Sequence, residues 1–253
     1  MKILITGARG FLGKNLINGL KKTNPDYEIY SYDVENTRED LYKYTRDCDF
    51  VFNFAAVHRP KDTGEFDRVN HVFFDDLLSM LKEHNNCCPV LYTSSIQATN
   101  GTDYGNSKLA AEADLRLYEK ETGGRAVIYR LTNVFGKWAT PNHHSVVATF
   151  CYNLVRDIPL VISNRSHMMR FYYIDDVIDS FINQLKCGVS ADEDGIYRLA
   201  EDKVYSITLG DLADTLTEIK NEGESIVIAE KELLIKKKLR ETYLSYFNAY
   251  KGE

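Results

Sequence analysis

Apolar runs of strand length alternate with helical periodicities along the first half of the chain. KILIT (residues 2–6) is a continuous apolar run, and apolar positions then recur at helical spacing over residues 11–22. EIYSY, DFVFNFAA and PVLYTSS predict three further strands, and FDRVNHVFFDDLLSMLKEH predicts a helix between the last two. Because strands alternate with helices, the pattern predicts an α/β fold with a doubly wound parallel sheet.

The pattern loosens after residue 130, where LTNVFGKWATPNHH is typical of a loop. Short strands are expected between four further helices, near residues 145–156, 174–187, 208–221 and 231–247. We therefore expect a first domain over residues 1–135, which also receives later strands, and a small interleaved lobe over residues 136–253.

Composition narrows the class of protein. The 253 residues carry a formal net charge of -6, and no apolar run approaches the roughly 20 residues that span a bilayer. We expect a soluble protein that binds neither membranes nor nucleic acid. MKILITGARG contains no secretion signal, and the five cysteines form no C-x-x-C pair, so we expect reduced thiols, a cytoplasmic location and no metal site.

Three predicted strand ends, TGARG, FAAVHRP and TSSIQATN, are expected to meet in one crevice, because parallel sheets bind ligands beyond the carboxyl ends of their strands. GARGFLG places Gly7, Gly10 and Gly13 between the first strand and the first helix. Such glycines permit a tight turn, close approach of a pyrophosphate to backbone N–H groups, and close packing of the helix. The candidate dinucleotide-binding residues here are Gly7, Arg9, Gly10, Phe11, Leu12, Gly13, Ala55 and Ala56.

Asp33 follows the second predicted strand. A carboxylate at this position can accept hydrogen bonds from the adenosine ribose hydroxyls and repels a 2′-phosphate, which favours NAD over NADP. Arg38 lies in the same acidic run and could still reach a 2′-phosphate, so NADP also stays open as the cofactor.

SSIQATNGTDYGNSK contains a candidate for proton transfer. On a helix beginning near Asp103, Tyr104 and Lys108 lie one turn apart on one face, so the lysine ammonium can favour the tyrosine phenolate. Tyr104 would then protonate a carbonyl oxygen while a nicotinamide delivers hydride to carbon, Ser95 would hold that oxygen, and Lys108 would also anchor the nicotinamide ribose. The predicted catalytic residues are therefore Ser95, Tyr104 and Lys108.

The glycine turn, FNFAA, the serines and YGNSK together resemble the short-chain dehydrogenase/reductase superfamily, in its extended, nucleotide-sugar-modifying branch. The resemblance covers residues 1 to about 200 and implies a Rossmann domain that binds NAD(P). It places the active hydroxyl on Ser95. Sugar 4,6-dehydratases of this fold carry an Asp-Glu pair at the next two positions, where this chain has Ile96 and Gln97. Because an amide cannot act as that general base, we expect hydride transfer or epimerisation rather than dehydration.

SSIQAT, YGNSKLAAE, RLTNVFGKW, PNHHSVVATFCYNLVR and YLSY together resemble the N-terminal reductase domain of CapF-type enzymes of capsule biosynthesis. That resemblance implies reduction of a 4-keto group on a UDP-linked 4-keto-6-deoxy-N-acetylhexosamine for surface polysaccharide, with NADPH in the subfamily. CapF-type enzymes also carry a zinc-binding cupin domain that epimerises C3. We expect that domain, or a separate partner replacing it, to lie outside this chain, which is either cut at the domain junction or a stand-alone reductase.

The resemblance also implies substrate contacts. Asn133 matches the asparagine that extended members use on the sugar or its phosphate, and Asn142 with His143 could reach the diphosphate. Arg170 resembles an arginine of the extended branch but lies one position later, which turns it to the other face of a strand. The expected substrate-binding residues are His58, Ser95, Gln97, Asn133, Asn142, His143 and Arg170.

Three functions remain open. The first is the NAD(P)H-dependent 4-keto reductase, and the alternative enzyme is a UDP-sugar 4-epimerase, which uses the same serine, tyrosine and lysine but retains NAD through each cycle. A non-catalytic NAD(P)-sensing scaffold is the third. A homodimer is expected, because the helices over residues 68–84 and 104–121 carry more apolar positions than one sheet face requires, and extended members pair these helices.

Overall fold

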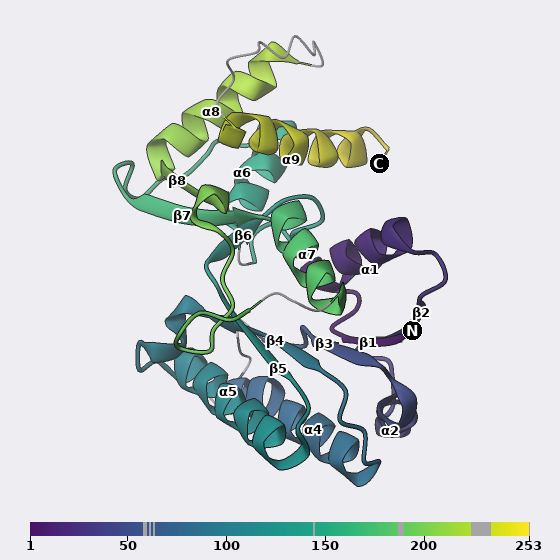
Figure 1. Cartoon of the computed structure of the whole chain (residues 1–253). Coiled ribbons are helices and arrows are strands. Elements are labelled where there is room, and N and C mark those ends of the chain that lie inside the picture. Colours follow the sequence, from purple (N-terminus) through teal and green to yellow (C-terminus); the bar gives the residue numbers. More distant parts are fainter. Residues whose placement is uncertain are drawn as a thin grey trace. The chain divides into compact units, whose positions relative to one another are not determined.

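The computed structural model describes residues 1–57, 60, 62, 64–143, 145–186, 190–223 and 234–252. Its contacts divide the chain into two units (Figure 1). The first unit contains Met1–Leu131 and Ile178–Arg198, and the second contains Thr132–Val177 and Leu199–Glu253. The chain thus leaves the first unit after Leu131 and returns to it at Ile178.

A five-stranded parallel sheet forms the centre of the first unit, in the order β2-β1-β3-β4-β5. Thr6 pairs with Asn53 and Ser95 pairs with Leu131, so the carboxyl ends of these strands lie along one edge. The strands are β1 (Lys2–Thr6), β2 (Glu28–Tyr32), β3 (Phe50–Asn53), β4 (Val90–Ser95) and β5 (Ala126–Leu131).

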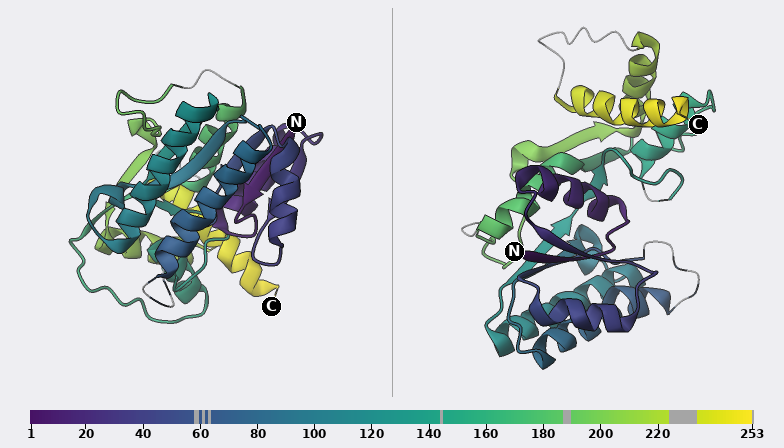
Figure 2. Two further views of the ribbon diagram at one scale, coloured as in Figure 1. Left: turned by 90° about the horizontal axis from the view of Figure 1, so that it is seen from below. Right: turned by 90° about the vertical axis from the view of Figure 1, so that its right-hand side faces the viewer.

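Helices cover both faces of this sheet, with α2, α4 and α5 on one face and α1 on the other (Figures 1 and 2). The sequence prediction of a doubly wound α/β fold is therefore confirmed. The helices are α1 (Phe11–Thr23), α2 (Arg38–Asp47), α4 (Phe73–Glu83), α5 (Asp103–Thr122) and α7 (Ile174–Asn183), with short turns at α3 (Glu65–Asp67), η1 (Arg68–Val72), η2 (Ile96–Thr99) and η3 (Gln184–Lys186).

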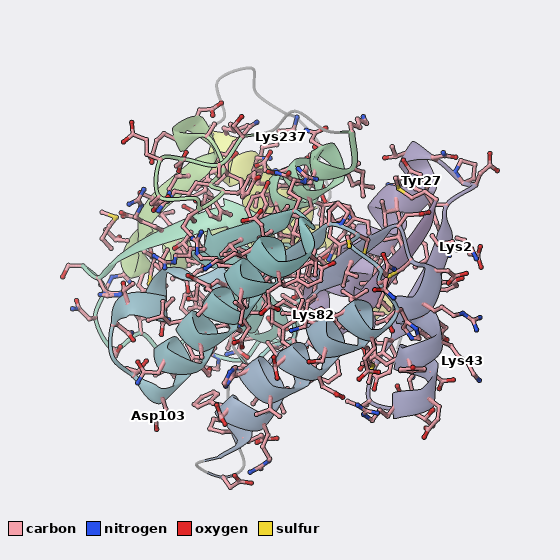
Figure 3. All side chains as sticks on the ribbon, turned by 60° about the horizontal axis from the view of Figure 1, so that its bottom comes forward. Lys2, Tyr27, Lys43, Lys82, Asp103 and Lys237 are labelled. Carbon is pink, nitrogen blue, oxygen red and sulfur yellow. The ribbon has the colours of Figure 1, made fainter. Side chains whose placement is uncertain are left out.

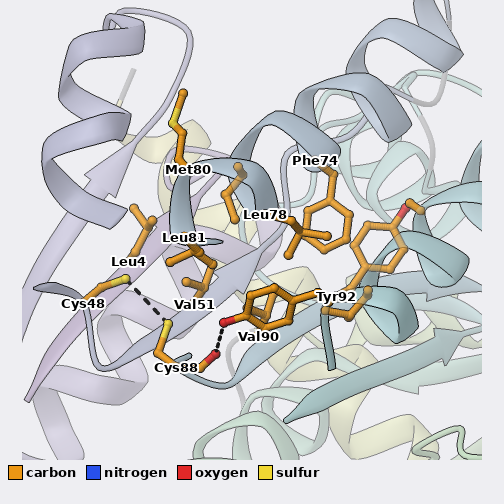
Figure 4. Packing of buried hydrophobic residues seen from close by; sticks show 14 of the residues in the cluster. Leu4, Cys48, Val51, Phe74, Leu78, Met80, Leu81, Cys88, Val90 and Tyr92 are labelled. Carbon is orange, nitrogen blue, oxygen red and sulfur yellow. Dashed lines mark hydrogen bonds between the residues drawn. The ribbon is translucent and has the colours of Figure 1, made fainter. Parts of the chain in front are cut away.

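The core beneath α4 and α5 explains why these segments are helical. Apolar side chains recur every three or four residues on α4, and this stripe packs on alternate residues of the strands. The rings of Phe74 and Tyr92 stack with their centroids 4.7 Å apart (Figure 4). The fully buried members include Leu4, Val51, Phe74, Leu77, Leu81, Val90, Tyr92, Leu115, Tyr118 and Ile128.

Two cysteines meet in the same core. The Sγ atoms of Cys48 and Cys88 lie 3.8 Å apart, which is a contact between thiols and not a covalent bond (Figure 4). Cys87 and Cys151 are also free, and Cys187 lies outside the described residues. Every cysteine that the structure describes is thus a thiol.

The second unit contains a three-stranded sheet in the order β6-β7-β8, with β6 parallel and β8 antiparallel to the central strand. Among the helices of the described residues, none has the length and apolar character needed to cross a membrane. The elements are β6 (Asn133–Phe135), β7 (Met168–Tyr173), β8 (Val204–Thr208), α6 (Val146–Val155), α8 (Leu209–Glu222) and α9 (Leu234–Lys251), with a short turn at η4 (Glu201–Lys203).

Three local features differ from the sequence prediction. Part of the predicted loop after residue 130 is a strand, because Asn133–Phe135 pairs with β7. The predicted helix between β3 and β4 is interrupted by a π-helical turn at Arg68–Val72. Helix α2 was not predicted, because its sequence is mostly polar. Its start is instead stabilised by a capping box between Thr37 and Asp40.

The core packing generates a stability prediction. Phe74→Ala should lower the free energy of unfolding by about 3–5 kcal/mol, because it removes a fully buried ring and leaves a cavity against Tyr92. Urea denaturation followed by circular dichroism measures the loss. Val34→Ala is the control, since the Val34 side chain is 92% exposed and its truncation should leave the midpoint unchanged. An unchanged midpoint for Phe74→Ala would contradict the described packing.

Candidate active site

The turn between β1 and α1 brings the chain close to the end of β3. Gly7 adopts a φ of +63°, and a Cβ at this position would lie 2.9 Å from the backbone of Phe54 and Ala55. Gly10 N donates to Gly7 O at 3.0 Å, which closes the turn. Any side chain at position 7 would therefore meet both backbone strain and a steric clash.

Gly13 lies inside α1, where a Cβ would come within 2.4 Å of Gly7 O and 2.6 Å of Ala8 O. Its lack of a side chain lets the first turn of the helix rest directly on the glycine turn. Gly10 is the N-cap residue of α1, and no side-chain hydrogen bond caps the helix there. The helix N-terminus, with its positive end of the dipole, is thus bounded by backbone only, which suits a pyrophosphate.

Asp33 follows β2 and closes the same turn from the other side. One carboxylate oxygen accepts from Arg9 N at 2.7 Å, and the other accepts from Val34 N at 2.9 Å. The Arg9 side chain pairs with Glu35. Arg38, which the sequence left as a possible 2′-phosphate contact, instead makes a two-pronged ion pair with Asp76 of α4.

Ser95 and Tyr104 are brought together where β4 ends and α5 begins. Thr102 caps α5 by accepting from Gly105 N, so the helix starts at Asp103, which Figure 3 labels, and Tyr104 lies in its first turn. Burial raises the pKa of Tyr104 to about 12, and a hydrogen bond with Ser95 opposes that rise. The ring of Phe66 packs edge-on against Tyr104 with the centroids 5.6 Å apart.

Lys108 lies one turn further along α5 and is 2% exposed. Its Nζ donates to Thr93 O at 3.0 Å and lies 4.9 Å from the ring centroid of Tyr92 and 5.9 Å from that of Tyr104. Burial lowers the pKa of Lys108 to about 7, and the charge of Glu112 opposes the fall. The geometry thus gathers a hydroxyl, a phenol and an ammonium, which is the set required to polarise and protonate a carbonyl oxygen.

Asn70 was not predicted as a site residue. It is fully buried in the π-helical turn η1, and its Oδ1 accepts from Val57 N at 2.7 Å. Its Nδ2 donates to Val57 O at 3.1 Å and to Ser107 Oγ at 3.3 Å. Asn70 therefore fastens the segment after Ala55 and Ala56 to α5. An amide inside the apolar stripe RVNHVFF was the available sequence signal.

Glu112 was also not predicted as a site residue. The Ser94 hydroxyl donates to Glu112 Oε1 at 2.5 Å, and Arg130 of β5 donates to both oxygens of the same carboxylate. The sequence signal was YGNSKLAAE, which places Tyr104, Lys108 and Glu112 four residues apart in turn.

The predicted substrate residues lie in different parts of the chain. Gln97 is exposed in η2 of the first unit, while four others belong to the second unit, and His58 lies outside the described residues. Asn133 Nδ2 donates to Arg170 O at 3.2 Å, which brings these two together.

The Arg170 guanidinium lies 3.5 Å from the carboxylate of Glu201. Asn142 and His143 are exposed, and Asn142 has a φ of +58° with its N–H bonded to Thr149 Oγ1.

The first unit fits a dinucleotide. Gly7, Gly10 and Gly13 form a turn packed too closely for side chains, Asp33 offers a carboxylate at this turn, and Lys108 is hydrogen-bonded to Thr93 O of β4, two strands away from β1 in the same sheet. A bound nicotinamide dinucleotide would supply the hydride. The described residues contain no cluster of three or more metal-ligating side chains.

Comparison with known proteins agrees with this geometry. Residues 3–200 match the model of the NAD dependent epimerase/dehydratase family. The chain is 38% identical over 246 residues to the UDP-2-acetamido-2,6-beta-L-arabino-hexul-4-ose reductase of Pseudomonas aeruginosa, covering 97% of this chain and 65% of that protein. The chain therefore spans less than two thirds of that relative's length.

Solved structures show the same similarity. The capsular polysaccharide assembling protein CapF of Staphylococcus aureus superposes with a TM-score of 0.86 at 32% identity, covering 100% of this chain and 67% of that chain. The UDP-glucuronic acid 4-epimerase of Bacillus cereus, in complex with NAD, superposes with a TM-score of 0.82 at 20% identity over 100% of this chain and 99% of that chain, which shows the fold alone. The predicted resemblance to extended short-chain dehydrogenase/reductases and to CapF is confirmed.

The glycine turn generates a binding prediction. Gly13→Ala should weaken NAD(H) binding by at least about tenfold, because the new methyl group would displace the Gly7 and Ala8 carbonyls that shape the turn. Titration of the protein with NADH, followed by nicotinamide fluorescence, measures the affinity. Gly252→Ala is the control, since a Cβ at position 252 would make only ordinary van der Waals contacts, at 3.6 Å or more. Equal affinities for both variants would exclude the turn as the cofactor site.

Proposed function

Because the chain belongs to the NAD-dependent epimerase/dehydratase family, we propose that it uses NAD(P)H to reduce the C4 keto group of a UDP-linked 4-keto-6-deoxy-N-acetylhexosamine. The product would serve surface polysaccharide synthesis. The observation that carries this proposal is the grouping of Ser95, Tyr104 and Lys108 at the end of β4, next to a glycine turn that fits a dinucleotide. The name of the 38% identical relative, a hexulose reductase, supports the substrate class.

Tyr104 supplies the proton in this proposal. Its raised pKa keeps the phenol protonated at neutral pH, which is the form that an acid needs in order to protonate the C4 oxygen. Ser95, hydrogen-bonded to the phenol, would hold the same oxygen. The nicotinamide supplies hydride to C4 when it is bound, so that the ketone becomes a secondary alcohol and the cofactor is oxidised.

Lys108 would hold the ribose of the cofactor through its ammonium and present positive charge beneath the Tyr104 ring. Once Tyr104 has donated its proton, that charge stabilises the phenolate until solvent returns a proton. Ile96 and Gln97 follow Ser95 in η2, where a dehydratase would need a pair of carboxylates, so simple hydride transfer fits this chain better than dehydration.

We assign Asn133, Asn142, His143 and Arg170 to contacts with the sugar diphosphate on the basis of sequence resemblance. Their exposed positions leave Asn142 and His143 accessible to a ligand. His58, Ser95 and Gln97 complete the proposed substrate contacts.

The choice between NADH and NADPH depends on the end of β2. Asp33 accepts from the Arg9 backbone N–H and Glu35 pairs with the Arg9 guanidinium, so two carboxylates and one basic group lie at this turn. This local charge favours NADH. The subfamily resemblance favours NADPH, for which Arg9 is the side chain best placed to contact the phosphate.

A homodimer, a cytoplasmic location and a cupin 3-epimerase outside this chain complete the proposal. The dimer would use the outer faces of η1 and α5, where Val72, Leu109 and Leu117 are 50%, 41% and 48% exposed. The free thiols and the use of a reduced nicotinamide fit the cytoplasm.

Turnover tests the proposed reaction. Tyr104→Phe should lower kcat by roughly 10²–10⁴-fold, because it removes the acid, while NADH and NADPH still bind. The assay follows oxidation of each cofactor with the UDP-4-keto-6-deoxy-N-acetylhexosamine, with and without a separate 3-epimerase.

Tyr27→Phe is the matched control. Tyr27, which Figure 3 labels, lies in a loop of the first unit. Suppose that the wild-type chain oxidises neither NADH nor NADPH with the epimerised ketone and yet retains NAD after purification. That result would indicate the UDP-sugar 4-epimerase instead. Full activity of Tyr104→Phe would exclude Tyr104 as the acid.

A second variant tests the nucleotide preference. Asp33→Ser should raise kcat/KM for NADPH relative to NADH by about tenfold or more, because a negative charge beside the 2′-phosphate is removed. Asp26→Ser, at an exposed position in the loop before β2, should leave the ratio unchanged. An unchanged ratio in Asp33→Ser would show that Asp33 does not face the adenosine ribose.

A further inference from the structure

A carboxylate is buried one helical turn beyond Lys108. Glu112 of α5 is 2% exposed, and isolated burial of a charged carboxylate would be costly. Three donors compensate for that cost: Ser94 Oγ at 2.5 Å, Arg130 Nε at 2.9 Å and Arg130 Nη2 at 2.7 Å. Such charge-assisted bonds, two of them from one guanidinium, fix the orientation of the carboxylate.

The sheet register explains how these groups meet. Ser94 of β4 and Arg130 of β5 are direct neighbours in the parallel ladder, so their side chains leave the same face of the sheet. That face is covered by α5, which contributes Glu112. The network therefore ties two adjacent strands to the helix that carries Tyr104 and Lys108.

The helix spacing then places the carboxylate next to Lys108. Tyr104, Lys108 and Glu112 follow one another at intervals of four residues, which puts them in one row along α5. Ser94 is also the residue between Thr93, whose carbonyl accepts from Lys108 Nζ, and Ser95. The same short stretch of β4 thus contacts the carboxylate, the ammonium and the phenol.

Few other charges lie near Lys108. The ionisable groups described around it are Tyr92 from β4, and Tyr104 and Glu112 from α5. Both phenols are neutral near pH 7, because burial raises the pKa of each.

On the side of η1 and α4, His71 Nε2 lies 3.0 Å from Asp114 of α5, while Nδ1 contacts Asp67, so this histidine is engaged in its own acidic pairs. Of the described groups, Glu112 is thus the negative charge that faces Lys108.

We propose that the Glu112 carboxylate keeps Lys108 in its ammonium form inside the protein, and that Ser94 and Arg130 position this carboxylate and hold β4 in register with α5. None of the three touches the reacting atoms in this account. They act through Lys108, so the inference rests on the role that the proposed function assigns to that lysine.

Burial and the Glu112 charge shift the pKa of Lys108 in opposite directions. Burial disfavours the ammonium and the Glu112 carboxylate favours it, so the pKa of Lys108 stands at about 7. Loss of the Glu112 charge would leave Lys108 without a nearby anion among the described groups, and the pKa of Lys108 would fall further. Loss of the Arg130 charge would remove the other cation that binds the Glu112 carboxylate, so this carboxylate would act more strongly on Lys108 and the pKa of Lys108 would rise.

The test measures the protonation of Lys108 directly. Lysine side-chain NMR signals of isotope-labelled protein are followed as a function of pH, and the Lys108 signal is assigned by its absence in Lys108→Met. In Glu112→Gln, which keeps the shape of the side chain, the midpoint should fall by at least about one pH unit. In Ser94→Ala, which keeps the carboxylate and removes one donor, the midpoint should stay close to that of the wild type.

A second variant should shift the Lys108 midpoint in the opposite direction. In Arg130→Gln, the midpoint should rise, and this variant decides the question if Glu112→Gln does not fold, because the Arg130 side chain is 21% exposed and easier to replace. A midpoint that does not fall in folded Glu112→Gln, or does not rise in Arg130→Gln, overturns the proposal.

Turnover separates this inference from the proposed function. If the reductase assignment is correct, the alkaline limb of kcat/KM in Glu112→Gln should move to lower pH together with the Lys108 midpoint, whereas a purely structural defect would lower activity equally at every pH. The NMR titration needs no substrate. It therefore tests the network even if the sugar ketone is not reduced.

Discussion

Burial of the Lys108 ammonium is the constraint on which the candidate site depends. A lysine is rarely enclosed unless its charge is compensated, and here the compensation comes from Thr93 O, the faces of two tyrosine rings and the Glu112 carboxylate. Each partner belongs to β4 or α5. The lysine therefore fixes the position of this helix over the strand, and with it the distance between Ser95 and Tyr104.

The cofactor side of the site depends on a different constraint, which is the absence of side chains. Gly7, Gly10 and Gly13 let the turn after β1 lie against the end of β3 and let α1 begin directly above it. Asp33 then closes the turn by accepting from Arg9 N. A positive φ at Gly7 and contacts too short for any Cβ make the same local structure incompatible with other residues.

The comparisons place these features in the NAD dependent epimerase/dehydratase family. Similarity extends over nearly all of this chain, yet the chain spans 65% of the reductase from Pseudomonas aeruginosa. The hydroxyl, phenol and ammonium groups of the candidate site all belong to the first unit. The sugar specificity proposed for the chain depends in addition on residues of the second unit, which sequence resemblance alone assigns.

The amino-acid sequence by itself determined strands β1 to β4, helices α1, α4 and α5, the glycine turn and the spacing of Tyr104 and Lys108, because these features depend on local periodicity and on neighbours within one turn of chain. The family prediction was also accessible from the motifs. The roles of the site residues stay predictions.

Helix α2, the short strand β6 and the π-helical turn that carries Asn70 were not predictable in this way, since capping, strand pairing and burial of an amide outweigh the apolar pattern there. The contacts of Glu112 with Ser94 and Arg130 were likewise decided only by the tertiary structure. Parallel strands distant in sequence have to pair in register before a helix can bury one carboxylate against both.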